Sequence, residues 1–214
     1  KSLDDQIIFK DKKKKLIYNG TKLKNLKKSK KKSNKINLLM LGVYEKRKGH
    51  DFLFKALHYL NKKKLDFICS IYGDGNYIEF NEVYKKIPPE IKNKIKLNKH
   101  KKNIIPLILE SDILLVPSQK LESFGYSALE AMALKKPVIS IQNHFLHDKL
   151  KNDLYTRLGF SYSAKDDEDL LNKIDGILKR KYDEIFNDQV IIGKKYFNTD
   201  KIVGDEIYNE ILKL

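Results

Sequence analysis

Short apolar runs alternate with stretches of helical periodicity from residue 36 onward, and this alternation restricts the chain to few folds. Buried strands are predicted at 36–41, 65–72, 95–97, 112–116, 137–141 and 159–162. Helices are predicted at 51–60, 77–86, 104–109, 126–134, 167–178, 182–192 and 202–212. Apolar strands separated by helices are typical of a parallel sheet covered on both faces. We therefore expect a Rossmann-like, doubly wound α/β fold with about six strands.

The composition divides the chain into three parts. Lysine dominates residues 1–36, which we expect to form a basic linker or edge segment leading into the domain. Residues 37–200 contain the alternating pattern and are expected to form the Rossmann-like domain itself. Residues 201–214 are expected to form a C-terminal helix.

The net charge of +16 favours an anionic partner. Only three of the 44 basic residues are arginines, however, and direct reading of DNA bases favours arginine. A nucleic-acid partner is therefore disfavoured. The abundance of lysine, asparagine and isoleucine is typical of the codon bias of an AT-rich genome, which is the first interpretation of the charge, and peripheral contact with an anionic membrane is the next. The single cysteine, Cys69, lies in an apolar run and fits a reducing cytoplasm. No apolar run is long enough to span a bilayer, so we expect a cytoplasmic protein.

Residues 117–133 form the segment most suited to chemistry, because they follow a buried strand and open a helix. Gly125 allows a ligand to approach the backbone closely. The amides of Gly125, Tyr126 and Ser127 are the free donors of a helix start, which suits a phosphate. Glu130 follows among apolar residues, where a carboxylate needs partners such as the two hydroxyls of a ribose. The alternative is that Glu130 faces solvent or pairs with a lysine.

Two further positions lie in loops at the same edge of the predicted sheet. Glu122 could accept hydrogen bonds from a sugar, or be an ordinary solvated acid. Lys48, beside Gly49, could reach a phosphate or be one more surface lysine. The turn at 73–75 lacks the three-glycine spacing of a dinucleotide site. The five histidines show no convincing metal-site spacing, so we expect no metal.

The order of these motifs resembles the C-terminal domain of family-4 glycosyltransferases, which have the GT-B fold. The matching motifs are Gly42…Lys48-Gly49, Gly73-x-Gly75, Ser111-Asp112…Pro117-Ser118, Glu122-Ser-Phe-Gly125 and Glu130-Ala-Met-Ala…Pro137-Val138. Glu122 and Glu130 stand at the spacing of that family's E-x7-E signature. The resemblance covers residue 16 to the end. It implies retaining, metal-independent sugar transfer from a nucleoside diphosphate sugar, with no further cofactor.

The resemblance also implies a role for each matching residue. Glu130 would hold the ribose. Glu122 and the backbone of Phe124 and Gly125 would hold the sugar. Lys48, Tyr126 and Ser127 would hold the diphosphate. Residues 97–102 would cover the base. The implied donor-binding set is Gly42, Arg47, Lys48, Glu122, Phe124, Gly125, Tyr126, Ser127 and Glu130. The implied catalytic residues are Glu122 and Lys48.

This chain departs from the family at three points. Val43 stands where the family commonly has arginine, so that Lys46 or Arg47 would replace that charge. The segment 142–148 lacks the family's usual glycine pair. GT-B enzymes use two domains, and we expect this chain to lack the N-terminal acceptor domain, toward which the helix at 201–214 would pack.

We therefore expect the donor-binding domain of a bacterial hexosyltransferase of polysaccharide biosynthesis. UDP-sugars are the favoured donors, and a glycan or lipid-linked molecule is the expected acceptor. Two alternatives stay open. One is a non-catalytic Rossmann-like partner or scaffold, favoured by Val43 and the 142–148 segment. The other, less favoured, is a basic nucleic-acid-binding domain.

Overall fold

The computed structural model describes residues 35–75, 78–118, 126–141, 163–164 and 167–179. Three of the predicted elements lie outside these ranges: the strand at 159–162 and the helices at 182–192 and 202–212. The basic segment at 1–34 and the C-terminal segment at 201–214 also lie outside them. The divisions predicted at residues 36 and 200 therefore stay predictions.

The described strands form one six-stranded sheet in which every pairing is parallel. They are β1 (Ile36–Leu41), β2 (Phe67–Gly73), β3 (Ile95–Lys99), β4 (Ile113–Val116), β5 (Val138–Ile141) and β6 (Ser163–Ala164). Their order is β3-β2-β1-β4-β5-β6, so the chain runs outward from β1 to one edge and then returns to build the other half. This order confirms the predicted doubly wound parallel sheet.

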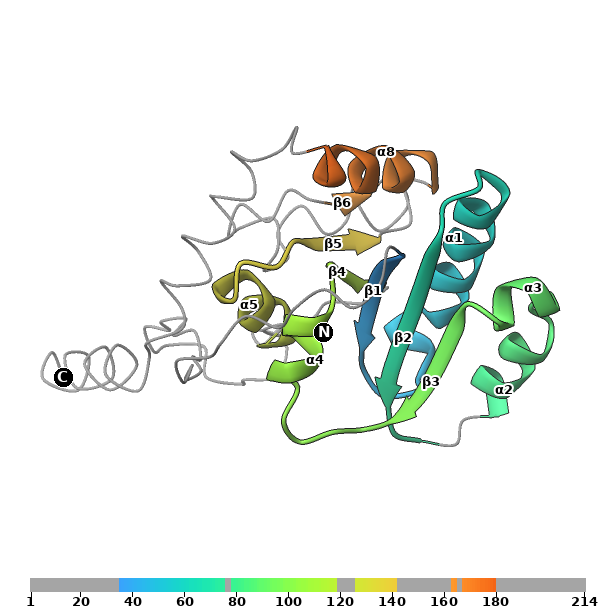
Figure 1. Cartoon of the computed structure of the whole chain (residues 1–214). Coiled ribbons are helices and arrows are strands. Elements are labelled where there is room, and N and C mark those ends of the chain that lie inside the picture. Colours follow the sequence, from blue (N-terminus) through green and yellow to red (C-terminus); the bar gives the residue numbers. More distant parts are fainter. Residues whose placement is uncertain (1–34, 76–77, 119–125, 142–162, 165–166, 180–214) are drawn as a thin grey trace, which may run out of the picture.

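Helices cover both faces of the sheet (Figure 1). One face carries α1 (His50–Lys62), α2 (Ile78–Lys85), α3 (Pro89–Lys92) and α8 (Asp167–Leu178). The other carries α4 (Ile105–Glu110) and α5 (Tyr126–Ala133). Each face buries its own apolar cluster, and this burial is the main force that holds the layers together.

Asp112 joins the two halves of the sheet at the amino ends of the strands. Its carboxylate accepts a hydrogen bond from the Asn37 amide at 2.9 Å, and its own amide donates to the Asn37 carbonyl at 2.8 Å. These bonds align β4 beside β1. The carboxyl ends of β1 and β4 are therefore neighbours, although α1, β2 and β3 separate them in the sequence.

Gly73 allows the loops after β1 and β2 to lie against each other. A Cβ atom at Gly73 would stand 2.1 Å from the Gly42 carbonyl oxygen, a distance that no side chain tolerates. The Gly42 amide also donates to the Tyr72 carbonyl at 3.0 Å. The glycine at position 73 is thus explained by close backbone contact.

Most of the predicted elements are confirmed, with shifts at their ends. The helix α3 was not predicted, because Pro88-Pro89 was interpreted only as the end of the preceding helix. Proline is also favoured at the first position of a helix, where its missing N–H costs nothing. Cys69 is fully buried, as expected, and burial raises the pKa of its thiol to about 12.

No helix within the described ranges has both the length and the apolar character needed to cross a membrane.

Candidate functional site

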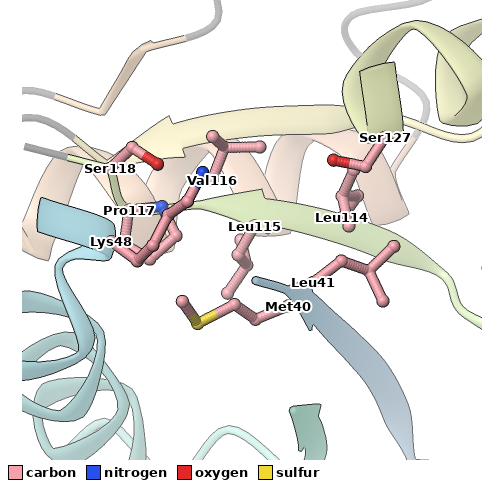
Figure 2. A pocket seen from close by; sticks show the side chains of 9 residues that line it. All are labelled: Met40, Leu41, Lys48, Leu114, Leu115, Val116, Pro117, Ser118 and Ser127. Carbon is pink, nitrogen blue, oxygen red and sulfur yellow. The ribbon is translucent and has the colours of Figure 1, made fainter. Parts of the chain in front are cut away.

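A cavity of about 20 Å³, room for one water molecule, lies beyond the neighbouring carboxyl ends of β1 and β4. The strand order reverses its direction between β1 and β4, which makes this position the topological switch point of the sheet. Ligands of doubly wound sheets bind in the crevice at the switch point. Figure 2 shows the residues that line this cavity: Met40, Leu41, Lys48, Leu114, Leu115, Val116, Pro117, Ser118 and Ser127. We call it the switch-point cavity.

Lys48 reaches the switch-point cavity from the loop between β1 and α1. It ends a 3-10 turn, η2 (Lys46–Lys48), which is followed by Gly49 in the left-handed conformation with φ 70°. Its aliphatic stem packs over Gly42, since Cδ would lie 3.5 Å from a Cβ atom there. A Cβ atom at position 42 would therefore be in ordinary van der Waals contact with the Lys48 side chain. The side chain extends toward Pro117 beyond the end of β4 (Figure 2).

The start of α5 reaches the same cavity from the opposite side. Ser127 is the second residue of the helix and lines the cavity together with Lys48 (Figure 2). Tyr126, the first residue, is 43% exposed. Ser118 also lines the cavity, although it was not among the predicted site residues. The sequence signal for Ser118 as a site residue is its position two residues after a buried strand, because ligands of such sheets bind beyond the carboxyl ends of the strands.

Glu130 lies one turn further along α5. Its neighbours Leu129 and Ala131 are fully buried, and Glu130 itself is half-buried. Its Oε2 atom is shielded from solvent. The carboxylate therefore lies at the border between core and solvent and is not an ordinary surface acid. The predicted site residues Glu122, Phe124 and Gly125 lie outside the described residues.

Arg47, also among the predicted donor-binding residues, is directed elsewhere. Its Nε atom donates to Glu45 Oε2 at 2.5 Å, and the side chain does not line the switch-point cavity. Its charge is thus at least partly compensated within its own turn.

The loops after β1, β2 and β3 are fastened to one another next to this site. Asp74 Oδ1 accepts a hydrogen bond from the His100 amide at 3.1 Å, and the Asp74 carbonyl accepts one from the Tyr44 amide at 3.0 Å. The Tyr44 hydroxyl donates to the Asn98 carbonyl at 3.1 Å. Burial raises the pKa of this hydroxyl, helped by the Asp74 charge. These loops line a more open hollow of about 500 Å³.

The loop after β3 also brings a lysine back over the sheet. Lys101 Nζ lies 5.7 Å from the centre of the Tyr72 ring, near the end of β2. An ammonium group at this distance over an aromatic face is attracted by the ring.

His50 begins α1 directly after the lysine turn and is 95% buried, being only 5% exposed. Its ring packs against Tyr44, Phe54 and Phe80. Burial lowers the pKa of His50 to about 4, although its hydrogen bond to the Glu45 backbone and the Asp51 charge oppose this shift. The imidazole is therefore neutral at physiological pH and is a component of the aromatic core.

Within the parts of the chain that the structure describes, no group of three or more histidine, cysteine, aspartate or glutamate residues could hold a metal ion.

The sequence and fold both match known proteins. Residues 21–195 match the family Glycosyl transferases group 1, a span that includes every described residue of the site. The chain belongs to this family. The predicted family is thereby confirmed, as is the GT-B type of fold, since the matched structures are glycosyltransferases of this type.

Two solved structures and one curated protein illustrate the similarity of this glycosyltransferase domain to known proteins. A glycosyltransferase from Rickettsia africae ESF-5 is 27% identical with a TM-score of 0.66, over 85% of this chain and 49% of that one. Anabaena Alr3699/HepE, solved with UDP and glucose, is 18% identical with a TM-score of 0.67, over 85% and 49%. An uncharacterized 41.2 kDa protein in the cps region of Klebsiella pneumoniae is 33% identical over 136 residues. That match covers 59% of this chain and 36% of the Klebsiella protein, so the chain spans half or less of these relatives.

Proposed function

We propose that this glycosyltransferase domain binds a nucleoside diphosphate sugar and supports retaining transfer of the sugar to a glycan or lipid-linked acceptor. One observation carries the proposal. Lys48 and Ser127, from different halves of the sheet, line one cavity at the topological switch point of a group 1 domain. The family resemblance implies contact with the diphosphate for both residues.

The diphosphate would lie over the switch-point cavity, which is itself too small to hold it, between Lys48 and the start of α5. A helix start offers free N–H donors and a favourable dipole, and Lys48 adds a full positive charge. The small residue Gly42 lets the ligand approach the end of β1. These groups would offset the charge that develops on the leaving diphosphate when the bond to the sugar breaks, which gives Lys48 its proposed catalytic role.

The other donor contacts follow along the same segment. The Glu130 carboxylate would accept hydrogen bonds from the two ribose hydroxyls. Glu122, with the backbone of Phe124 and Gly125, would hold the sugar. Tyr126 and Ser127 would contact the diphosphate through their amides.

The relatives suggest the kind of donor and pathway. Anabaena Alr3699/HepE has been solved with UDP-glucose, and the Klebsiella relative is encoded in a cps region. We therefore propose a UDP-hexose donor and a role in bacterial surface polysaccharide synthesis, in the cytoplasm or at the inner face of the membrane. Residues 37–200 would be the donor domain, and the helix at 201–214 would pack toward an acceptor domain.

The proposal is tested by calorimetric titration of the 214-residue chain with UDP, GDP and ADP. We expect saturable binding of at least one of them. Glu130→Ala should weaken that binding by about 1–3 kcal/mol, because the ribose hydroxyls lose their acceptor. Glu110→Ala, at an exposed position of α4, is the matched control and should leave the affinity unchanged.

Absence of binding by folded protein to all three nucleotides would contradict the proposal. Unchanged affinity of Glu130→Ala would remove Glu130 from the site. Binding without transfer from a radiolabelled donor by the full-length enzyme would instead favour the non-catalytic alternative.

A further inference from the structure

A nucleoside diphosphate carries two or more negative charges. Among the described residues that line the switch-point cavity, one is a cation, Lys48. The residue that follows Gly42 is Val43, which is uncharged. Lys46 and Arg47 are the other candidates in this turn, but Lys46 lines a different pocket, beside α1 and α2, and the Arg47 Nε atom is bonded to Glu45. Any second cation would therefore come from another loop.

The loop after β3 places Lys101 beside the site. Its Nζ lies 5.7 Å from the centre of the Tyr72 ring. Tyr72 pairs directly with Leu41 across the β1–β2 ladder, and Leu41 lines the switch-point cavity together with Lys48. Tyr72 and Leu41 both pack against the apolar cluster on the α5 face of the sheet. Lys101 therefore lies one strand away from the cavity, on the same face and at the same carboxyl edge.

Hydrogen bonds hold the backbone of this loop in place. The His100 amide, adjacent to Lys101, donates to Asp74 Oδ1 at 3.1 Å. The Asn98 carbonyl, at the end of β3, accepts from the Tyr44 hydroxyl at 3.1 Å. The loop that carries Lys101 is therefore held by hydrogen bonds, and the ammonium group of Lys101 lies over the Tyr72 ring at the end of β2.

The charge of Lys101 is also not neutralised by an acid. Across the described ranges, Lys101 takes part in no salt bridge, in contrast to Arg47 with Glu45. A contact with the face of an aromatic ring leaves the positive charge able to attract an anion. The adjacent Lys102 is exposed and has no such ring beneath it.

We propose that Lys101 is the second cationic contact for the diphosphate of the donor, with Tyr72 and Asp74 as the residues that position it. For Lys101 this replaces the contact with the base that the family resemblance implies for residues 97–102. This proposal rests on the proposed function, because it assigns a further residue to the same donor site. The ligand class is a nucleoside diphosphate, and the group recognised is its diphosphate.

The test compares a nucleoside diphosphate with its monophosphate by calorimetric titration. The probe pair is UDP with UMP, or the corresponding GDP or ADP pair if that diphosphate binds the wild type more tightly. For Lys101→Gln we expect about fivefold weaker diphosphate binding, as for loss of one exposed ion pair, and a monophosphate affinity within twofold of wild type. Lys101→Arg should restore diphosphate affinity. Lys63→Gln, which removes an exposed lysine over the Tyr59 ring directly after the end of α1, should match the wild type. Equal melting temperatures of the variants establish that each is folded.

Two results would overturn the inference while leaving the proposed function standing. One is a Lys101→Gln variant that binds the diphosphate as tightly as the wild type. The other is an equal loss of diphosphate and monophosphate affinity, which would place Lys101 at the part that the two ligands share and not at the second phosphate. Failure of the wild type to bind any of UDP, GDP and ADP would overturn the proposed function itself, and the assignment of Lys101 with it.

Discussion

At the scale of the residue, His50 shows how a polar side chain is changed by its surroundings. The imidazole is buried among aromatic rings, and this burial lowers its pKa from 6.5 to about 4. Between these two values the unfolded chain binds a proton at this position and the folded chain does not. Stability must therefore fall as the pH drops through this window, and it is independent of His50 at higher pH.

This linkage gives a measurable prediction. The free energy of unfolding contributed by His50 should fall by about 2 kcal/mol between pH ~7.5 and ~5. Urea unfolding of the wild type and of His50→Phe at both pH values would show it, since the variant has no imidazole to protonate. Asn93→Ala, at an exposed position with no ionisable side chain, serves as the control and should keep the wild-type dependence. Identical pH dependence of His50→Phe and wild type would contradict the prediction.

Single residues also show how far prediction from sequence reaches. Lys48, Ser127 and Glu130 are predicted donor-site residues, and the structure brings Lys48 and Ser127 to one cavity, while their roles stay predictions. Lys101 was not singled out, because one lysine among 41 lysines has no distinguishing pattern. What sets Lys101 apart is where its ring lies: Tyr72 is at the carboxyl end of β2, so the contact joins the loop after β3 to a neighbouring strand beside the site.

At the scale of the element, two helices are followed within two residues by a lysine with a strained, left-handed backbone. Lys64 follows α1 with φ 61°, and Lys135 follows α5 with φ 59°. Glycine is the usual residue in this left-handed conformation, because a Cβ atom makes it costly.

We expect Lys64→Gly to stabilise the domain by about 0.5–1 kcal/mol, since the relief of strain outweighs the greater freedom of glycine in the unfolded chain. Thermal or urea unfolding would measure the change. Lys63→Gly is the matched control: Lys63 has φ −81°, so this substitution should be neutral or destabilising. A Lys64→Gly variant that is less stable than Lys63→Gly would contradict the prediction that the backbone of Lys64 is strained.

Element types were predictable because they depend on local periodicity. The buried runs that became β1, β4 and β5, and the helical patterns of α1 and α5, are visible in windows of about ten residues. The helix α3 was missed because Pro88-Pro89 is compatible both with the end of one helix and with the start of another.

At the scale of the whole molecule, the net charge of +16 predicts weak, general attraction to polyanions. Such binding depends on counterion release and weakens steeply with salt. We expect binding of a DNA oligonucleotide at low salt to be lost by about 0.3 M NaCl, while nucleoside diphosphate binding persists. Fluorescence anisotropy for DNA and calorimetry for the nucleotide would measure the two dependences.

Glu130→Ala provides the control for this comparison, because it should weaken nucleotide binding without changing DNA binding. DNA binding that resists salt and is tighter than nucleotide binding would support the nucleic-acid alternative in place of the proposed function.

The sequence by itself determined the parallel α/β architecture, the family and the segments that contain the donor-site motifs. Those properties are local, since they depend on periodicity and on the spacing of residues within one segment. Only the tertiary structure decided which segments meet. The strand order sets β4 beside β1, which brings Lys48 to Ser127, and sets β2 beside both β1 and β3, which places Lys101 near the same edge. Strand order is set by the packing of both faces of the sheet at once, and no single segment of the sequence contains that information.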